Sequence, residues 1–174
     1  MSEIKLLTSE LKEKASILHA GDRVLLSGVV YTARDAAHKR FFELLSKGED
    51  LPFDIDGACI YYCGPTPTPE GLPIGSAGPT TSSRMDPYAP KLLDLGLSGM
   101  IGKGARNEAV NDALKRNKAV YFAAIGGAGA LCSKCITSCE VIAFSDLGCE
   151  SVKRLVLDDF PVVVATDSFG DTLY

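Results

Sequence analysis

Short apolar runs alternate with helix-like segments along the chain. Residues 24–31 (VLLSGVVY) form one such run, and the turn residues Gly21 and Asp22 precede it. An apolar run of this length after a turn predicts a buried strand. Similar runs predict further strands at residues 58–62, 99–101, 120–124, 141–144 and 162–165.

Apolar residues at helical spacing separate several of these runs. Thr32 stands three residues before Asp35, which predicts a capping box at the start of a helix. A later helix is expected to have Pro87 or Pro90 in its first turn. The predicted helices cover residues 34–46, a segment that ends near residue 95, and residues 106–115 and 128–139.

The order of strands and helices favours an α/β fold with a mostly parallel sheet. No repeat, low-complexity stretch or linker-like run divides the chain, so we expect residues 1–174 to form a single domain. Residues 65–79 are too rich in Pro and Gly for a helix or a central strand. Ligands bind at the carboxyl ends of parallel strands, and most of the unusual residues fall in loops at such ends.

Composition narrows the functional classes. The 18 Lys and Arg and 22 Asp and Glu residues give a net charge of −4, and the basic residues are scattered, so we expect no nucleic-acid partner. No stretch approaches the ~20 apolar residues that span a bilayer, and residues 1–14 lack the apolar run of a secretion signal. These features predict a cytoplasmic protein whose six cysteines are thiols or metal ligands and not a disulfide framework.

Residues 75–86 (GSAGPTTSSRMD) carry the strongest functional signal. Four hydroxyl residues in a row follow Gly-Pro and end at Arg84, a pattern unsuited to core packing. Hydroxyls and backbone N–H groups at a helix start can converge on an anion, and an arginine can hold a carboxylate with two parallel hydrogen bonds. The segment therefore predicts an anion site; the alternative is a hydroxyl-rich loop before a capped helix.

Two further cations lie in unusual positions. Arg34 falls in the first turn of a predicted helix, where the helix dipole disfavours a positive charge. Lys103 stands between two glycines, which let the backbone approach a ligand closely; a solvated turn is the alternative. We interpret Asp35 as a helix cap and His38 as a structural hydrogen-bonding residue rather than a base.

Two other motifs point to chemistry less directly. Residues 126–129 (GGAG) lack the full spacing of a dinucleotide-binding loop, and we interpret them as tight strand-to-helix packing. Cys132, Cys135 and Cys139 have a spacing that resembles a cluster or zinc motif. Because all three share one face of the predicted helix and no fourth ligand is obvious, we favour buried packing over metal binding.

In combination, these motifs resemble the carboxy-terminal domain, or separate β subunit, of class I (iron–sulfur) fumarate hydratases and the related tartrate dehydratases. The resemblance extends from about residue 21 to about residue 170. The segments that carry it are Arg34-Asp35-x-Ala37-His38, Gly78-Pro79-Thr80-Thr81-x-x-Arg84-Met85-Asp86, Ile101-Gly102-Lys103-Gly104, Gly126-Gly127-x-Gly129-Ala130-Leu131 and Asp146-Leu147-Gly148-x-Glu150.

The resemblance implies a three-layer β/β/α swivelling domain and a reversible hydro-lyase reaction, (S)-malate to fumarate plus water. It implies that Thr80 is the base that takes a proton from the substrate, with Lys103 also catalytic. Arg34, Thr81, Arg84 and Lys103 are implied to bind the carboxylates of a small dicarboxylate substrate. A 4Fe–4S cluster is implied in a partner α subunit and not in this chain, so we expect activity only with that partner.

Other interpretations remain open. Ser82 and Ser83 stand where fumarate hydratases more often have Ala-Gly, which favours a tartrate enzyme, whereas the short length and residues 126–131 favour fumarate. The alternative enzyme is an L-tartrate dehydratase or methylfumarate hydratase β subunit. Alternatives of other classes are a stand-alone binding module for small carboxylates and a small metalloprotein that uses the three clustered cysteines. A homodimer is a further expectation for the isolated chain.

Overall fold

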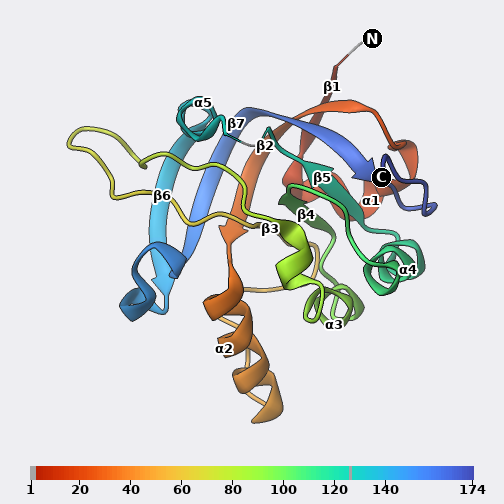
Figure 1. The fold of residues 1–174 in the computed structure, drawn as a ribbon, viewed down its shortest axis with the longest axis horizontal. Coiled ribbons are helices and arrows are strands. Elements are labelled where there is room, and N and C mark those ends of the chain that lie inside the picture. Colours follow the sequence, from red (N-terminus) through yellow and green to blue (C-terminus); the bar gives the residue numbers. More distant parts are fainter. Residues whose placement is uncertain (1–2, 126) are drawn as a thin grey trace.

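The computed structural model of the protein describes residues 3–125 and 127–174. Its main feature is a single curved sheet with helices beside it (Figure 1). Within these residues seven strands form one sheet in the order β1-β2-β3-β4-β5-β7-β6, and β2 also pairs with β7. The strands are β1 Ile4–Leu7, β2 Arg23–Thr32, β3 Cys59–Tyr61, β4 Gly99–Gly102, β5 Val120–Ala123, β6 Ile136–Ala143 and β7 Val152–Thr166.

The sheet closes on itself through its last strand. Strands β1 to β5 pair in parallel, whereas β7 is antiparallel to β2, β5 and β6. Val163 on β7 stands opposite both Arg23 on β2 and Ala123 on β5, so β7 joins the two ends of the parallel series. The predicted α/β class is confirmed, and the sheet is mixed and barrel-like.

The described helices are short, and none has the length and apolar character needed to cross a membrane. Helices α2, α3 and α4 lie on the same side of the sheet (Figure 1). The helical segments are η1 Thr8–Glu10, α1 Leu11–Lys14, η2 Ala15–Ile17, α2 Asp35–Ser46, η3 Ser82–Met85, α3 Ala89–Asp94, α4 Glu108–Asn117, α5 Gly129–Lys134 and η4 Ser145–Glu150. As predicted, α3 has a proline, Pro90, in its first turn.

Two hydrophobic clusters lie on opposite faces of the parallel strands. Tyr61, Ile101 and Phe122 belong to the cluster inside the curved sheet. Their sequence neighbours, such as Met100 and Tyr121, belong to the cluster that packs under α2, α3 and α4. Because successive side chains of a strand point to opposite faces, both faces of β3 to β5 are buried, which explains their uninterrupted apolar runs.

The predicted helix over residues 128–139 is wrong in its second half. Helix α5 ends at Lys134, and β6 begins at Ile136. Cys139 lies on β6 opposite Leu155 of β7, so it does not share a helix face with Cys132 and Cys135. The β-branched residues of this segment favour a strand, and pairing with β7 decides the outcome.

Two strands are poorly marked in the sequence. Strand β1 is only four residues long and was not predicted. Strand β7 extends over 15 residues, of which the predicted run 162–165 is only the end. Its first half carries Lys153, Arg154 and Asp158, which hide the apolar alternation, and Asp159 interrupts it with a φ of 46°.

Candidate active site at the carboxyl end of β3

Three segments that are distant in sequence meet at the carboxyl end of β3. The Ala33 N–H donates to Tyr61 O at 3.2 Å, and the Thr80 N–H donates to Tyr62 O at 2.8 Å. The Tyr62 N–H in turn donates to Ile101 O at 2.8 Å. The end of β2, the hydroxyl-rich segment and the end of β4 therefore meet at one sheet edge, as expected for loops that follow parallel strands.

Arg34 is fixed at its backbone and buried along part of its side chain. It holds the N-cap position of α2 with an extended backbone, and its carbonyl accepts from the backbone N–H of His38 at 2.9 Å and from His38 Nδ1 at 2.8 Å. A Cβ at Gly64 would lie 2.9 Å from Arg34 Cδ, so the glycine makes room for the arginine. Arg34 Nε lies 3.8 Å from Glu150 Oε1, and this buried donor has no hydrogen-bond partner within residues 3–125 and 127–174.

An unpaired buried donor costs ~1–3 kcal/mol. Such a donor could bind a ligand oxygen without breaking a hydrogen bond of the fold. Arg34 is the N-cap of α2 and does not lie in its first turn, so its predicted place was off by one position.

The predicted capping box at Thr32 is wrong. The Thr32 hydroxyl is buried, accepts from the Lys153 N–H at 3.0 Å and lies 3.3 Å from Ser151 O, so it ties β2 to the start of β7. The first turn of α2 is capped from another segment, because the Ala36 N–H donates to Glu150 Oε1 at 3.4 Å. A tertiary contact has replaced the local cap.

Asp35 is likewise not a helix cap. Its carboxylate binds Arg84, with Nε to Oδ1 at 3.0 Å and Nη2 to Oδ2 at 2.6 Å. Both side chains are partly exposed, at 48% for Arg84 and 37% for Asp35. The pair joins the start of α2 to η3. It holds Arg84 against Asp35, the next residue after Arg34, although Asp35 and Arg84 are 49 positions apart in the sequence.

Ser82 belongs to the core rather than to a ligand site. Its N–H donates to Lys103 O at 2.9 Å, its Oγ accepts from the Lys103 N–H at 3.0 Å, and Tyr121 Oη lies 2.8 Å from that Oγ. A Cβ at Gly102 would lie 1.9 Å from Ser82 Oγ. Gly102 is therefore needed for the approach of Ser82, not of a ligand, whereas Gly104 has a φ of +83° and no neighbour within 4 Å of its Cβ position.

The remaining predicted residues line the surface beside this contact. Thr81 forms a parallel bridge with Lys103, so the two lie side by side. Thr80 and Lys103 are half-buried, and Thr81 and Arg84 are exposed. Among the residues that the structure describes, Lys103 forms no ion pair with a carboxylate. A half-buried ammonium without a counter-charge is available to an anion.

A buried ion pair that the sequence argument missed holds the far end of η3. Arg106 is 7% exposed and its Nε donates to Asp86 Oδ1 at 2.6 Å. Asp86 Oδ2 also accepts the Asn107 N–H at 2.9 Å. The Arg106 guanidinium lies over the rings of Tyr62 and Tyr121 at 5.2 and 4.9 Å. Ser82 and Asp86 therefore fix the backbone on both sides of Arg84.

His38 is a structural residue, as predicted. Its ring is fully buried, and burial lowers its pKa from 6.5 to about 4. The ring donates from Nδ1 to Arg34 O and is neutral at neutral pH, while Nε2 has no partner among the described residues. A buried imidazole with so low a pKa is a poor base at neutral pH, and its role is to hold the Arg34 backbone.

The glycine-rich segment supports the same region through packing. Gly126 lies outside the described residues. The Ala77 N–H donates to Gly129 O at 3.0 Å, and a Cβ at Gly129 would lie 2.9 Å from Gly78 N. The tight packing inferred from the sequence is thus present at Gly129, but it joins α5 to the loop before Thr80 rather than a strand to a helix.

The six cysteines are free thiols in this structure. No group of three or more His, Cys, Asp or Glu side chains suited to a metal ion occurs in residues 3–125 and 127–174. Cys132 lies on α5 and Cys139 on β6, so the single helix face expected for the three clustered cysteines is absent. Cys132 is buried, and the half-buried Cys135 and Cys139 pack against the cluster inside the sheet.

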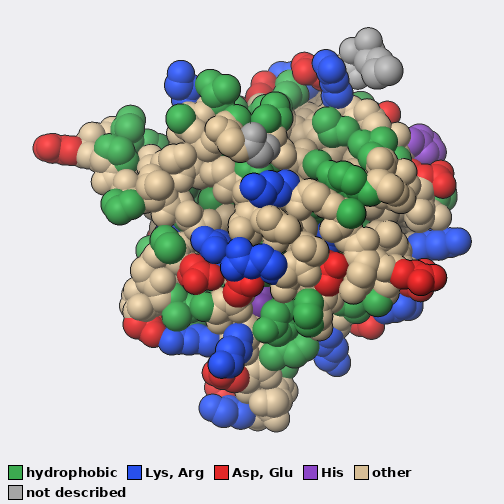
Figure 2. Space-filling view, viewed as in Figure 1, with side chains coloured by type: hydrophobic (Ala, Val, Ile, Leu, Met, Phe, Trp, Pro, Cys, Tyr) green, Lys and Arg blue, Asp and Glu red, His purple; other side chains and the backbone are tan. Residues whose placement is uncertain are grey.

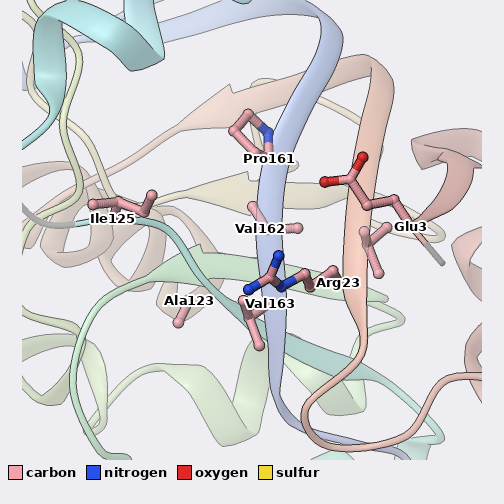
Figure 3. A pocket seen from close by; sticks show the side chains of 8 residues that line it. Glu3, Arg23, Ala123, Ile125, Pro161, Val162 and Val163 are labelled. Carbon is pink, nitrogen blue, oxygen red and sulfur yellow. The ribbon is translucent and has the colours of Figure 1, made fainter. Parts of the chain in front are cut away.

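Charged side chains of both signs gather near the middle of the face that Figure 2 shows, over the region where η3 and the start of α2 lie in Figure 1. A separate cavity of about 310 Å³ lies elsewhere (Figure 3). None of the candidate residues lines it; its walls are Glu3, Arg23, Val24, Ala123, Ile125, Pro161, Val162 and Val163. The candidate site is thus a charged surface and not this cavity.

Comparison with known proteins agrees with these features. A family model described as Fumarase C-terminus matches residues 1–174. Fumarate hydratase 2 of Leishmania major is 37% identical over 174 residues, which cover 99% of this chain and 31% of that protein. The putative L(+)-tartrate dehydratase subunit beta of Methanocaldococcus jannaschii is 36% identical over 169 residues, 94% of this chain and 87% of that subunit.

The chain belongs to the fumarase C-terminus family. Within this family, the class I anaerobic fumarate hydratase of Escherichia coli is 36% identical over 167 residues, 95% of this chain and 30% of that protein. The chain therefore spans about a third of the length of the fumarate hydratases that it matches, and most of the length of the tartrate dehydratase subunit. The resemblance inferred from the motifs is confirmed.

Proposed function

We propose that this chain is the β subunit of an iron–sulfur-dependent hydro-lyase that acts on a four-carbon dicarboxylate, with fumarate hydratase as the activity. The reaction is the reversible conversion of (S)-malate to fumarate and water. The observation that carries the proposal is the buried Nε of Arg34, which has no hydrogen-bond partner among the described residues, at the sheet edge where the segments of Arg84 and Lys103 also meet. The chain is related to class I fumarate hydratases and a tartrate dehydratase subunit.

The three cations bind the substrate carboxylates in this proposal, with Thr81 as a further contact. Removal of a proton from the carbon next to a carboxylate builds negative charge on that carboxylate in the transition state. Fixed cations stabilise this charge without having to reorganise. Arg34 suits this role because His38 holds its backbone and Gly64 leaves room for its side chain.

Thr80 takes the substrate proton in this proposal. Its backbone is fixed to the end of β3 by the hydrogen bond to Tyr62 O. An aliphatic hydroxyl is a weak base, so its alkoxide form has to be stabilised by nearby positive charge. Lys103, bridged to the neighbouring Thr81, is the cation best placed to do so, which gives it a catalytic role as well as a binding role.

The iron–sulfur cluster belongs to a partner in this proposal, as the resemblance to the β subunits of class I hydro-lyases implies. A chain that matches a third of the single-chain fumarate hydratases and most of a β subunit is suited to act with a separate α subunit. That α subunit would cover Thr80, Arg84 and Lys103 and exclude water, which strengthens the effect of the cations. The three-layer swivelling architecture and a cytoplasmic location remain predictions.

Tartrate is the second candidate substrate, because the chain covers 87% of a related putative tartrate dehydratase subunit. Ser82 supports a tartrate enzyme less than its place in the sequence suggests. The Ser82 hydroxyl is buried against Tyr121 and the Lys103 N–H, so it does not face a ligand. Of Ser82 and Ser83, Ser83 is the exposed one, so it is the one that could contact a ligand.

Reconstitution tests the proposal. The chain would be purified alone and after co-expression with an iron–sulfur α subunit, and both preparations would be assayed with malate, fumarate and tartrate. We expect turnover only from the mixture, with malate and fumarate as the better substrates. Turnover by the iron-free chain alone would refute the two-subunit model. Carboxylate binding with no turnover in the mixture would favour a stand-alone binding module.

A further inference from the structure

The ion pair between Asp35 and Arg84 has no role in the function proposed above. Its geometry is specific: Asp35 occupies one edge of the guanidinium, formed by Nε and Nη2, at 3.0 and 2.6 Å. A guanidinium can form a second pair of parallel hydrogen bonds on its other edge, between Nη1 and Nη2. The pair therefore leaves that second edge of Arg84 available.

The backbone around this pair is already fixed. Ser82 and Asp86 hold η3 against the core, and His38 holds the residue before Asp35. The long side chain of Arg84, which is half exposed, is the one part of this arrangement that the core does not hold. Asp35 supplies the contact that selects one orientation for it.

We propose that Asp35 is a positioning residue that aims the free edge of Arg84 at the substrate and thereby sets the affinity for the carboxylate. The inference rests on the proposed function, because it takes Arg84 as a substrate-binding residue. Asp35 touches neither the substrate nor the reacting atoms; it acts through Arg84. A second effect is electrostatic, since Asp35 and Glu150 offset part of the repulsion among Arg34, Arg84 and Lys103.

An opposite role for Asp35 makes a different prediction. If its carboxylate competed with the substrate for Arg84, removing the charge would free the guanidinium and strengthen substrate binding. If Asp35 orients Arg84, the same change weakens binding. Asp35→Asn separates the two, because the amide NH2 faces an N–H of the guanidinium and cannot accept the second hydrogen bond.

Asp94 provides a matched control. Its carboxylate binds Arg116 with the same two nitrogens, Nε at 2.9 Å and Nη2 at 3.2 Å. The exposures are similar, at 52% for Arg116 and 45% for Asp94. This pair joins α3 to α4 and lies outside the proposed site, and Asp94 Oδ1 also accepts from Asn117 Nδ2 at 2.7 Å. Asp94→Asn therefore reports what weakening such a surface pair does away from the site.

The kinetic test uses the chain reconstituted with the iron–sulfur α subunit. For Asp35→Asn we expect KM for malate to rise about ten-fold, with a smaller change in kcat, because the main loss is in carboxylate binding. Asp35→Glu, which keeps a carboxylate, should recover part of the affinity, and Asp94→Asn should leave KM unchanged. An unchanged or lowered KM in Asp35→Asn would overturn the inference.

A second measurement separates this inference from the proposed function. The Nε–H NMR signal of Arg84 in the full chain, assigned by its loss in Arg84→Lys, should be sharp in the wild type and broadened in Asp35→Asn. If the wild-type complex turns over no four-carbon acid, the proposed function fails, and the NMR signal still tests whether Asp35 orders Arg84. An Arg84 signal that is the same in both proteins would contradict the positioning role.

Discussion

Two arginine–carboxylate pairs lie beside η3, and they share their chemistry but not their surroundings. Arg106 and Asp86 are sealed in the core, with side-chain exposures of 0% and 6%. Arg84 and Asp35 lie at the surface, with exposures of 48% and 37%. The first pair is fully used by the fold, whereas the second leaves part of its arginine free.

The buried pair therefore serves the fold, whereas the exposed pair is available for ligand binding. A buried pair costs much desolvation and is strongly destabilising when one partner is removed, so it fixes the path of η3. An exposed pair contributes little to stability, so substitutions there can change ligand binding without unfolding the protein. Substitutions at the buried pair should therefore reduce stability much more than substitutions at the exposed pairs.

Asp86→Asn should destabilise the protein most. It leaves the Arg106 guanidinium buried without its counter-charge, which typically costs ~3–5 kcal/mol. Urea denaturation of wild type and variant, with unchanged slope, measures the loss in the free energy of unfolding. A loss below about 1 kcal/mol would mean that the core tolerates the unpaired charge and that the buried pair does not differ from the exposed pair in its effect on stability.

His38 tests the same buried layer through pH. Burial lowers its pKa to about 4 in the folded chain, from an ordinary value of 6.5. The unfolded chain therefore binds the proton first as the pH falls, so stability should decrease between about pH 6.5 and 4, by about 3 kcal/mol in total. Denaturation curves at a series of pH values should show this slope, and His38→Gln should flatten it. An equal slope in both proteins would contradict the assignment.

Arg84→Lys tests the exposed pair through catalysis. An ammonium cannot form two parallel hydrogen bonds with a carboxylate, so kcat/KM of the reconstituted enzyme should fall about 10- to 100-fold, with a raised KM. The free energy of unfolding should change by less than about 1 kcal/mol. Arg116→Lys is the control at a comparable surface pair. A large loss of stability with normal kinetics would reverse the roles of the two pairs.

Asp94→Asn should have the smallest effect. Its pair with Arg116 is exposed, and pairs of this kind contribute ~0–1 kcal/mol. Thermal unfolding should differ from that of the wild type by a few degrees at most. A loss close to that of Asp86→Asn would show that exposure does not distinguish the two kinds of pair in this protein.

The sequence predicts strands β2 to β5 and the residues at their ends better than it predicts side-chain contacts between distant segments. Strands β2 to β5 follow from uninterrupted apolar runs because both faces of each strand are buried. Cys139 was misplaced because a cysteine spacing that suits a helix is also compatible with a strand, and only the pairing with β7 distinguishes them. Charged residues on β7 hid half of that strand for a similar reason.

Partners distant in sequence explain the errors in the site. Thr32 and Asp35 have the spacing of a capping box, but their side chains bind Lys153 and Arg84 instead. Local spacing carries no information about such contacts. The pairing of Asp86 with Arg106 was missed for the same reason. Arg34 and the segment from Thr80 to Arg84 were selected as candidates because their unusual local context is visible in the sequence itself.

Turnover of Thr80→Val by the reconstituted enzyme tests whether Thr80 is the base that takes the substrate proton. The valine keeps the shape of the side chain and removes the hydroxyl, so we predict a loss in kcat of about 10²–10⁴-fold with assembly and cluster content unchanged. Thr80→Ser, which restores a hydroxyl, should retain part of the activity. Near-normal turnover of malate by Thr80→Val would contradict the account and assign the base to the partner subunit.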